Sequence, residues 1–157
     1  MGEAITNLIS EVQQQEAELL FNSFTSDDAM EIGTRLYQKA KLDNLKIAIS
    51  ISVNRRQLFH CSLAGATPDN DNWLRKKENV VYHFFKSSYQ MALLMEVREQ
   101  DLCQRFGLSS HDYVASGGSF PITLKSTGVI GAISVSGLPH EEDHAMVVNV
   151  IQEYLQK

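Results

Sequence analysis

Two histidines separated by one helical turn open the last segment of the chain with helical periodicity. His140 and His144 enclose two glutamates and Asp143. This spacing matches His-Glu-x-x-His, in which both imidazoles bind zinc and the glutamate acts as a general base. The extended form of the pattern needs a glycine and a third histidine where this chain has Val147 and Val150. We therefore do not expect a hydrolytic zinc site.

His144 also lies on the apolar stripe of the same helix, together with Val147, Val148 and Ile151. Removal from water and the helix dipole both favour the neutral form of an imidazole at this position. A neutral imidazole can coordinate iron or accept a hydrogen bond. The alternative is a core histidine held by Asp143 or by a backbone carbonyl.

A glycine loop comes before the last pair of predicted strands. Glycine has no Cβ and permits positive φ, so the Gly117-Gly118 backbone can closely approach a ligand or another subunit. The loop has neither a dinucleotide fingerprint nor a Walker lysine. A hairpin turn at residues 126–128 would return the loop and the end of the last strand to the start of the final helix, where free amides attract an anion. The predicted ligand-binding residues at this corner are Gly117, Gly118, Ser119, Phe120, Ser136, Gly137, His140, Asp143 and His144.

A second candidate group lies on an earlier helix. Lys76, Asn79 and His83 share one helical stripe, and Arg75 stands beside it. These cations could hold carboxylates such as the propionates of a tetrapyrrole, and His83 would join His144 as a candidate metal ligand. A solvated polar face is the alternative interpretation.

Covalent hydrolysis is not indicated. The sequence has no Gly-x-Ser-x-Gly elbow, and neither Cys61 nor Cys103 stands in an activating context. The two cysteines are far apart without a Cys-x-x-Cys spacing, which is typical of reduced thiols in a cytoplasmic protein. We therefore expect no enzyme of this kind.

Hydrophobic periodicity predicts the elements that must position these residues. Ile47, Ile49 and Ile51 alternate with polar or small residues and mark the clearest strand. Hairpins without crossover helices predict an α+β fold of the profilin kind, a five-stranded antiparallel sheet with helices on both faces. The expected elements are a first helix around 5–12, a short strand at 19–21, a helix over 26–41, strands at 45–53 and 58–63, a helical region over 70–106 with a break near 87–88, strands at 120–125 and 129–136, and a helix from 139 onward.

Bulk composition sets the remaining limits. With 157 residues, 43% of them hydrophobic and 21% charged, the chain fits one domain over residues 1–157. A formal charge of −5 argues against nucleic acid as a partner. No signal peptide opens the chain and no apolar run approaches the ~20 residues that span a bilayer, so we expect no membrane association and a cytoplasmic location.

Several motifs together resemble one known family. They are residues 117–122 (Gly-Gly-Ser-Phe-Pro-Ile), 128–131 (Gly-Val-Ile-Gly), 136–139 (Ser-Gly-Leu-Pro) with 143–144 (Asp-His), and the segment 73–88. This set is similar to the haem-degrading-domain proteins, which are related to haem-binding uptake proteins, glycolate-operon proteins and the C-terminal domain of some corrinoid adenosyltransferases. The resemblance covers roughly residues 15–157 and implies a profilin-like fold, homo-oligomers and a tetrapyrrole ligand, either haem or a corrinoid.

The sequence thus favours an oligomeric ligand-binding or accessory protein of tetrapyrrole metabolism. Apolar helical surface over 1–20 and 84–106, which one small sheet would not cover, is a second argument for a homo-oligomer. The alternative is an oligomeric adaptor with no small-molecule chemistry.

Overall fold

A computed structural model describes residues 2–156. None of the helices in this range is long and apolar enough to cross a membrane. The elements in chain order are α1 (Gly2–Glu18), α2 (Ser26–Leu42), β1 (Ala48–Val53), β2 (Arg56–Ser62), α3 (Pro68–Phe84), α4 (Ser88–Arg98), α5 (Leu102–Phe106), β3 (Ser119–Leu124), β4 (Gly128–Ser136) and α6 (His140–Leu155).

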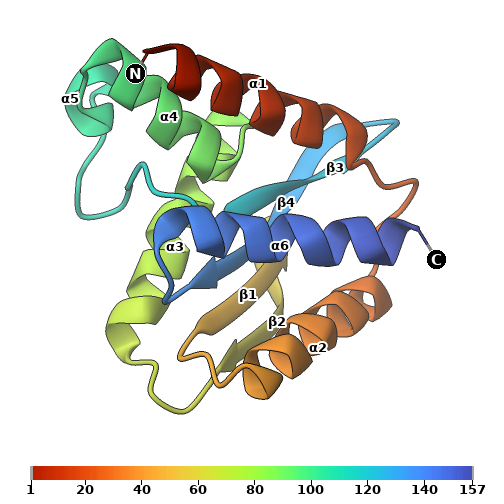
Figure 1. Cartoon of the computed structure of the whole chain (residues 1–157). Coiled ribbons are helices and arrows are strands. Elements are labelled where there is room, and N and C mark those ends of the chain that lie inside the picture. The colour runs from red at the N-terminus through yellow and green to blue at the C-terminus, as the bar shows by residue number, and fades with distance from the viewer. Residues whose placement is uncertain (1, 157) are drawn as a thin grey trace.

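The strands form one antiparallel sheet in the order β2-β1-β4-β3, with Ile51 of β1 opposite Ile133 of β4. Helices α2 and α6 cover one face and α3 covers the other (Figure 1). The α+β class with an antiparallel sheet is confirmed. The prediction of five strands was wrong, because the described residues contain four. Phe21 forms only an isolated bridge with Leu124, since the chain turns into α2 soon afterwards, at the cap residue Thr25.

The two faces of the sheet differ in chemistry because side chains alternate along each strand. The face under α2 and α6 carries the apolar core, which includes Ile49, Ile133 and Val135. The face under α3 carries small buried polar residues instead. Ser52, for example, hydrogen-bonds Glu78 and Tyr82 of α3. The buried serines of the four strands are Ser50, Ser52, Ser119, Ser134 and Ser136.

The predicted helical region 70–106 is three helices. The break near Ser87-Ser88 is confirmed: α3 ends at left-handed Phe85, and the Ser87 side chain caps α4 by accepting from Gln90 N at 3.1 Å. A second break separates α4 from α5, where Glu99 is left-handed and Asp101 caps α5. Gly107 ends α5 with φ 68°, as its position after the helical pattern predicted.

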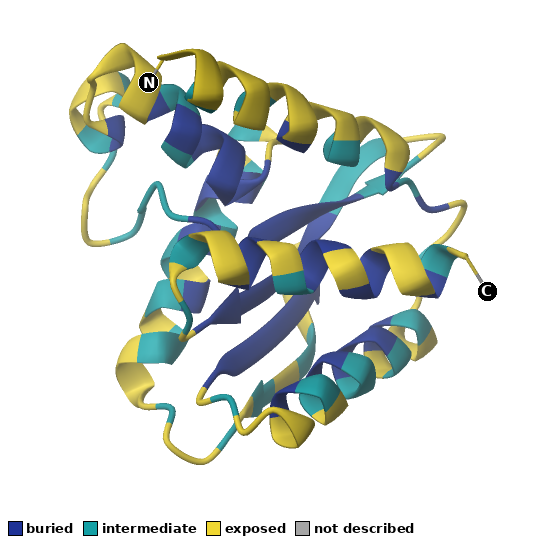
Figure 2. Ribbon diagram, viewed as in Figure 1, coloured by how far each residue is buried: buried dark blue, intermediate teal, exposed yellow. Residues whose placement is uncertain are grey.

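The apolar surfaces of the N-terminal helix and of α4 cover each other. Val12 of α1 packs with Tyr89 and Leu93 of α4, and Met91 and Met95 of α4 pack against Leu102 of α5. The apolar area that argued for oligomers is therefore largely used within the chain, and the homo-oligomer remains a prediction from the resemblance alone. The outer side of α1 is exposed along most of its length (Figure 2).

Candidate functional site

The glycine loop, the end of β4 and the start of α6 meet around a buried lysine. Lys77 of α3 is 1% exposed. Its Nζ donates to Gly117 O at 3.0 Å, to Val135 O at 2.6 Å and to Asp143 Oδ2 at 3.3 Å. Each of the three ammonium protons thus has an acceptor. The lysine fastens three segments that are far apart in the sequence.

Sequence reasoning missed Lys77 and selected its neighbour Lys76. The helical spacing could have identified Lys77. Residue 77 is three residues after Leu74 and four before Val81, so it lies on the same face of the helix as these two buried residues. A lysine on the buried stripe of a helix needs an acid or carbonyl partner, since an unpaired ammonium is costly to bury. Asp143 of α6 provides that partner.

The pair is held in a dry environment. Burial raises the pKa of Asp143 to about 6, although Lys77 and the Leu138 amide favour its ionised form. Burial likewise lowers the pKa of Lys77, against the attraction of Asp143. Asp143 Oδ1 accepts from Leu138 N at 3.0 Å, so both carboxylate oxygens are used. The 3.3 Å separation between Lys77 Nζ and Asp143 Oδ2 is that of a buried ion pair.

The packing at this corner explains why residues 117 and 118 are glycines. Gly118 has φ 132°, and a Cβ there would overlap Lys77 Nζ and Val135 O. A Cβ at Gly117 would lie 2.5 Å from His140 O. The space that the missing side chains leave is filled by the lysine and by the turn into α6.

A cavity of about 260 Å³ adjoins the ion pair. Lys77 and Asp143 contribute to its lining, and Trp73 and His140 are also part of its wall. His140 Nδ1 accepts from Gly117 N at 3.0 Å, which ties the wall to the glycine loop. The predicted corner residues that line the cavity are Ser136, Gly137, His140 and Asp143. Ligand binding at this corner remains a prediction.

His144 follows Asp143 in α6 but lies outside that cavity. It is 4% exposed, and its ring lies 4.7 Å from the Tyr89 ring and 5.9 Å from the Phe120 ring, between centroids. Nε2 is 2.8 Å from Oε1 of Gln15, whereas Nδ1 has no hydrogen-bond partner among the described residues. Burial, and secondarily the charge of His140, lowers the pKa of His144 to about 4. The imidazole is therefore neutral at pH 7.

The partner of His144 was not predicted. The core interpretation expected Asp143 or a backbone carbonyl, but Asp143 is engaged with Lys77, and His144 Nε2 donates instead to Oε1 of Gln15 in α1. No local sequence signal connects residue 15 with residue 144, because the contact depends on how α1 lies across α4.

The predicted stripe on α3 is separate from the corner. The Arg75 guanidinium donates to Asp112 Oδ1 at 2.9 Å, and Asn79 Nδ2 donates to Asp112 O at 2.8 Å. His83 packs against Tyr113 at 5.6 Å between ring centroids. Lys76 lines a different cavity, of about 590 Å³, together with Tyr113. These four residues face the segment after α5, and the structure does not bring them to His144.

Among residues 2–156 no group of three or more histidine, cysteine or acidic side chains is placed to hold a metal ion.

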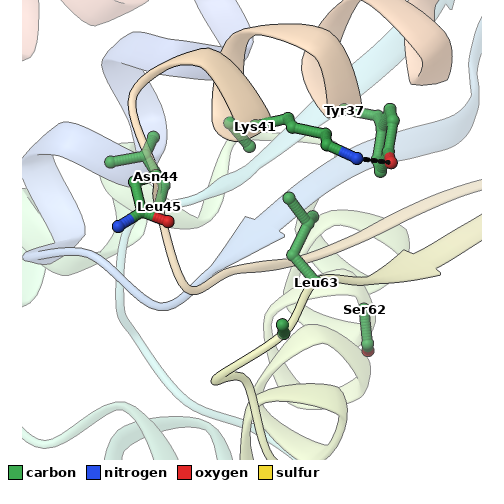
Figure 3. Close-up of a pocket in the computed structure, with 8 residues that line it drawn as sticks. Tyr37, Lys41, Asn44, Leu45, Ser62 and Leu63 are labelled. Atoms are coloured by element: carbon green, nitrogen blue, oxygen red, sulfur yellow. Dashed lines mark hydrogen bonds between the residues drawn. The ribbon is translucent and has the colours of Figure 1, made fainter.

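A third cavity, of about 300 Å³, lies between α2 and the end of β2, away from the corner (Figure 3). Lys41 Nζ donates there to Tyr37 OH at 3.4 Å, and the wall offers no acid–base pair.

Fold and site together define an α+β protein with one four-stranded antiparallel sheet and a lysine–aspartate corner beside a buried imidazole. A family model described as "Haem degrading protein HbpS-like" matches residues 24–152, so the chain belongs to the HbpS-like family. A UPF0303 protein of Serratia proteamaculans is 44% identical over 142 residues, which are 90% of this chain and 88% of that protein. Helix α1 lies before the matched region.

Solved structures agree with this assignment. The crystal structure of Ybr137w protein has a TM-score of 0.87 and 27% identity, covering 94% of this chain and 87% of that one. The crystal structure of a PduOC:heme complex has a TM-score of 0.69 at 13% identity, covering 83% and 94% of the two chains. The second likeness shows the fold alone.

Proposed function

We propose that this protein is a haem-binding accessory protein, with the imidazole of His144 as the iron ligand. The proposal rests on one observation about His144. Its imidazole is buried and neutral, and Nδ1 has no hydrogen-bond partner among the described residues. Membership of the HbpS-like family and the fold shared with a haem-complexed protein support haem as the group bound.

The residues around His144 fit a metal ligand. The carboxamide oxygen of Gln15 can only accept, so Nε2 carries the ring proton and Nδ1 keeps its lone pair. A second hydrogen bond that fixes tautomer and ring orientation is typical of histidines that bind metals. An orphaned buried nitrogen is otherwise costly, and most proteins satisfy such atoms. Coordination would relieve that cost.

The residues around His144 would orient a bound haem and exclude water from it. The rings of Tyr89 and Phe120 lie 4.7 Å and 5.9 Å from the imidazole, between centroids, so the surroundings of the ligand are aromatic and largely apolar. When bound, haem supplies an iron that coordinates and exchanges axial ligands. The stripe with Arg75 and Lys76 is not assigned to this site, because it contacts the segment after α5.

Titration of the full-length protein with haemin tests the proposal. The wild type should show a Soret shift that saturates at one haemin per site, and His144→Ala should lose it. His83→Ala is the matched control, because His83 is an exposed histidine on another helix, and its Soret shift should match that of the wild type. A parallel titration with hydroxocobalamin separates haem from a corrinoid. A weak, nonsaturating change in every variant would contradict haem binding and favour the adaptor.

We also infer from the resemblance that the accessory protein works as a homo-oligomer. Light scattering at micromolar protein should give a mass that is a multiple of the 17.6 kDa chain. A monomer under these conditions would contradict the inference without affecting the haem titration.

A further inference from the structure

Helix α1 is attached to the rest of the protein by few side chains. Val12 is the one buried residue of the helix and packs with Tyr89 and Leu93 of α4, and the half-buried Ile5 and Ile9 pack against the same cluster. The remainder of α1 is half-buried or exposed, as Figure 2 shows. Small buried area gives a low free energy of local opening. The helix precedes residues 24–152, which the family model matches.

The polar contacts of α1 concentrate at its C-terminal end. Gln15 reaches His144 Nε2 at 2.8 Å. The next residue, Glu16, accepts from Ser87 N at 3.2 Å and from Ser87 Oγ at 2.8 Å. With its amide nitrogen turned toward the carboxylate, Gln90 donates to Glu16 as well. Two adjacent polar residues thus close over the imidazole and over the start of α4.

This arrangement blocks His144. The imidazole is 4% exposed, the rings of Tyr89 and Phe120 pack near it and Gln15 is bonded to Nε2, so a ligand in solution does not reach it in this closed state. None of the cavities described above includes it. A ligand can therefore contact His144 only after a covering element moves, and α1 has one buried residue whereas α4 has six.

The chain after α1 is fixed to the sheet. Phe21 is 2% exposed, and its backbone bonds Thr123 O and Lys125 N, each at 2.9 Å. Leu19 is buried in the main core. The helix can consequently swing away from α4 at about residue 18 while the rest of the chain keeps its fold.

We propose that α1 is a removable cover over the His144 site, held closed by Val12, Gln15 and Glu16, which opens to admit the ligand and then closes again so that Gln15 regains its contact with His144 Nε2. Opening uncovers the Gln15 side of the imidazole together with Tyr89 and Leu93, the apolar residues of α4 that pack on Val12. The identity of that ligand rests on the haem-binding function proposed above. The movement of the cover does not depend on that function.

The test compares two substitutions of the same kind on the two sides of α1. Val12→Ser removes the buried anchor, whereas Leu8→Ser changes an apolar residue that is already 38% exposed. Hydrogen exchange of the peptide 2–18 measures opening, and carbethoxylation of His144 by diethyl pyrocarbonate, followed by peptide mass spectrometry, measures access. Both rates should rise by about tenfold or more in Val12→Ser and stay within about twofold of wild type in Leu8→Ser.

Haemin association, followed by stopped flow, gives the third readout and should accelerate only in Val12→Ser. Unchanged exchange in β1 and β4 shows that the variant keeps its core. If α1 opens but His144 labelling stays at the wild-type rate, the cover proposal is wrong. If opening and labelling rise together and no variant binds haemin, the cover proposal stands and the haem-binding function fails.

Discussion

The ammonium of Lys77 lies 3.3 Å from Oδ2 of Asp143, and this contact joins α3 on one face of the sheet to the first turn of α6 on the other. Both side chains are almost fully buried. The pair is surrounded by the carbonyls of Gly117 and Val135, which the same ammonium satisfies. The contact thereby links helices that pack on opposite faces of the sheet, at the predicted corner.

Substitution of Lys77 by methionine should destabilise the protein strongly. The change leaves a buried carboxylate without its cation and two carbonyls without donors, for which we expect a loss of about 3–5 kcal/mol in the free energy of unfolding at pH 7. Urea denaturation measures it. The double variant Lys77→Met/Asp143→Leu should recover part of the loss, because no unpaired charge remains. A double variant less stable than Lys77→Met would contradict this account.

Substitution of Gly118 by alanine should cost more than the same change at Gly128. Both glycines have positive φ, at 132° and 101°, so both substitutions carry backbone strain of about 1–3 kcal/mol. At Gly128 nothing lies within 4 Å of the added methyl group, whereas at Gly118 it meets Lys77 and Val135. The difference between the two melting temperatures isolates crowding around the ion pair. Equal shifts would mean that the corner can move aside.

Much of this fold follows from local sequence patterns. Alternation around Ile49 located β1, and the predicted break near residues 87–88 falls where Ser87 caps α4. The error at residues 19–21 has a simple cause. An apolar triplet has strand propensity, but pairing depends on a free edge and on a chain direction that residues 22–25 do not maintain. Only the single bridge at Phe21 forms.

The candidate site was predicted in outline. The hairpin turn determines that the glycine loop and the start of α6 share one end of the sheet, and the Gly117 N to His140 Nδ1 bond confirms this juxtaposition. Lys77 and Gln15 were missed because their roles depend on contacts across the fold. The Arg75 stripe was selected on periodicity, which identifies a helix face but not the segment that packs on it.

The docking of α1 should depend on pH through Glu16. Burial raises the pKa of Glu16 from an ordinary 4.5 to about 7, against the opposing effects of Ser87 and Lys86. A carboxyl whose pKa is raised in the docked state favours docking when protonated, so docking weakens as the pH rises from about 4.5 through 7. His144 acts in the opposite sense. Its pKa falls from an ordinary 6.5 to about 4 on burial, so docking weakens as the pH falls through that interval.

In the wild type these two effects offset each other between pH 4.5 and 6.5, where one group gains a proton on docking and the other loses one. Glu16→Gln removes only the first effect. Exchange of the peptide 2–18, corrected for the intrinsic pH dependence of amide exchange, should then rise toward acid by up to about tenfold per pH unit below pH 6.5. The wild-type profile should stay nearly flat over the same interval. An equally flat profile in Glu16→Gln would mean that neither group changes its proton binding when α1 docks.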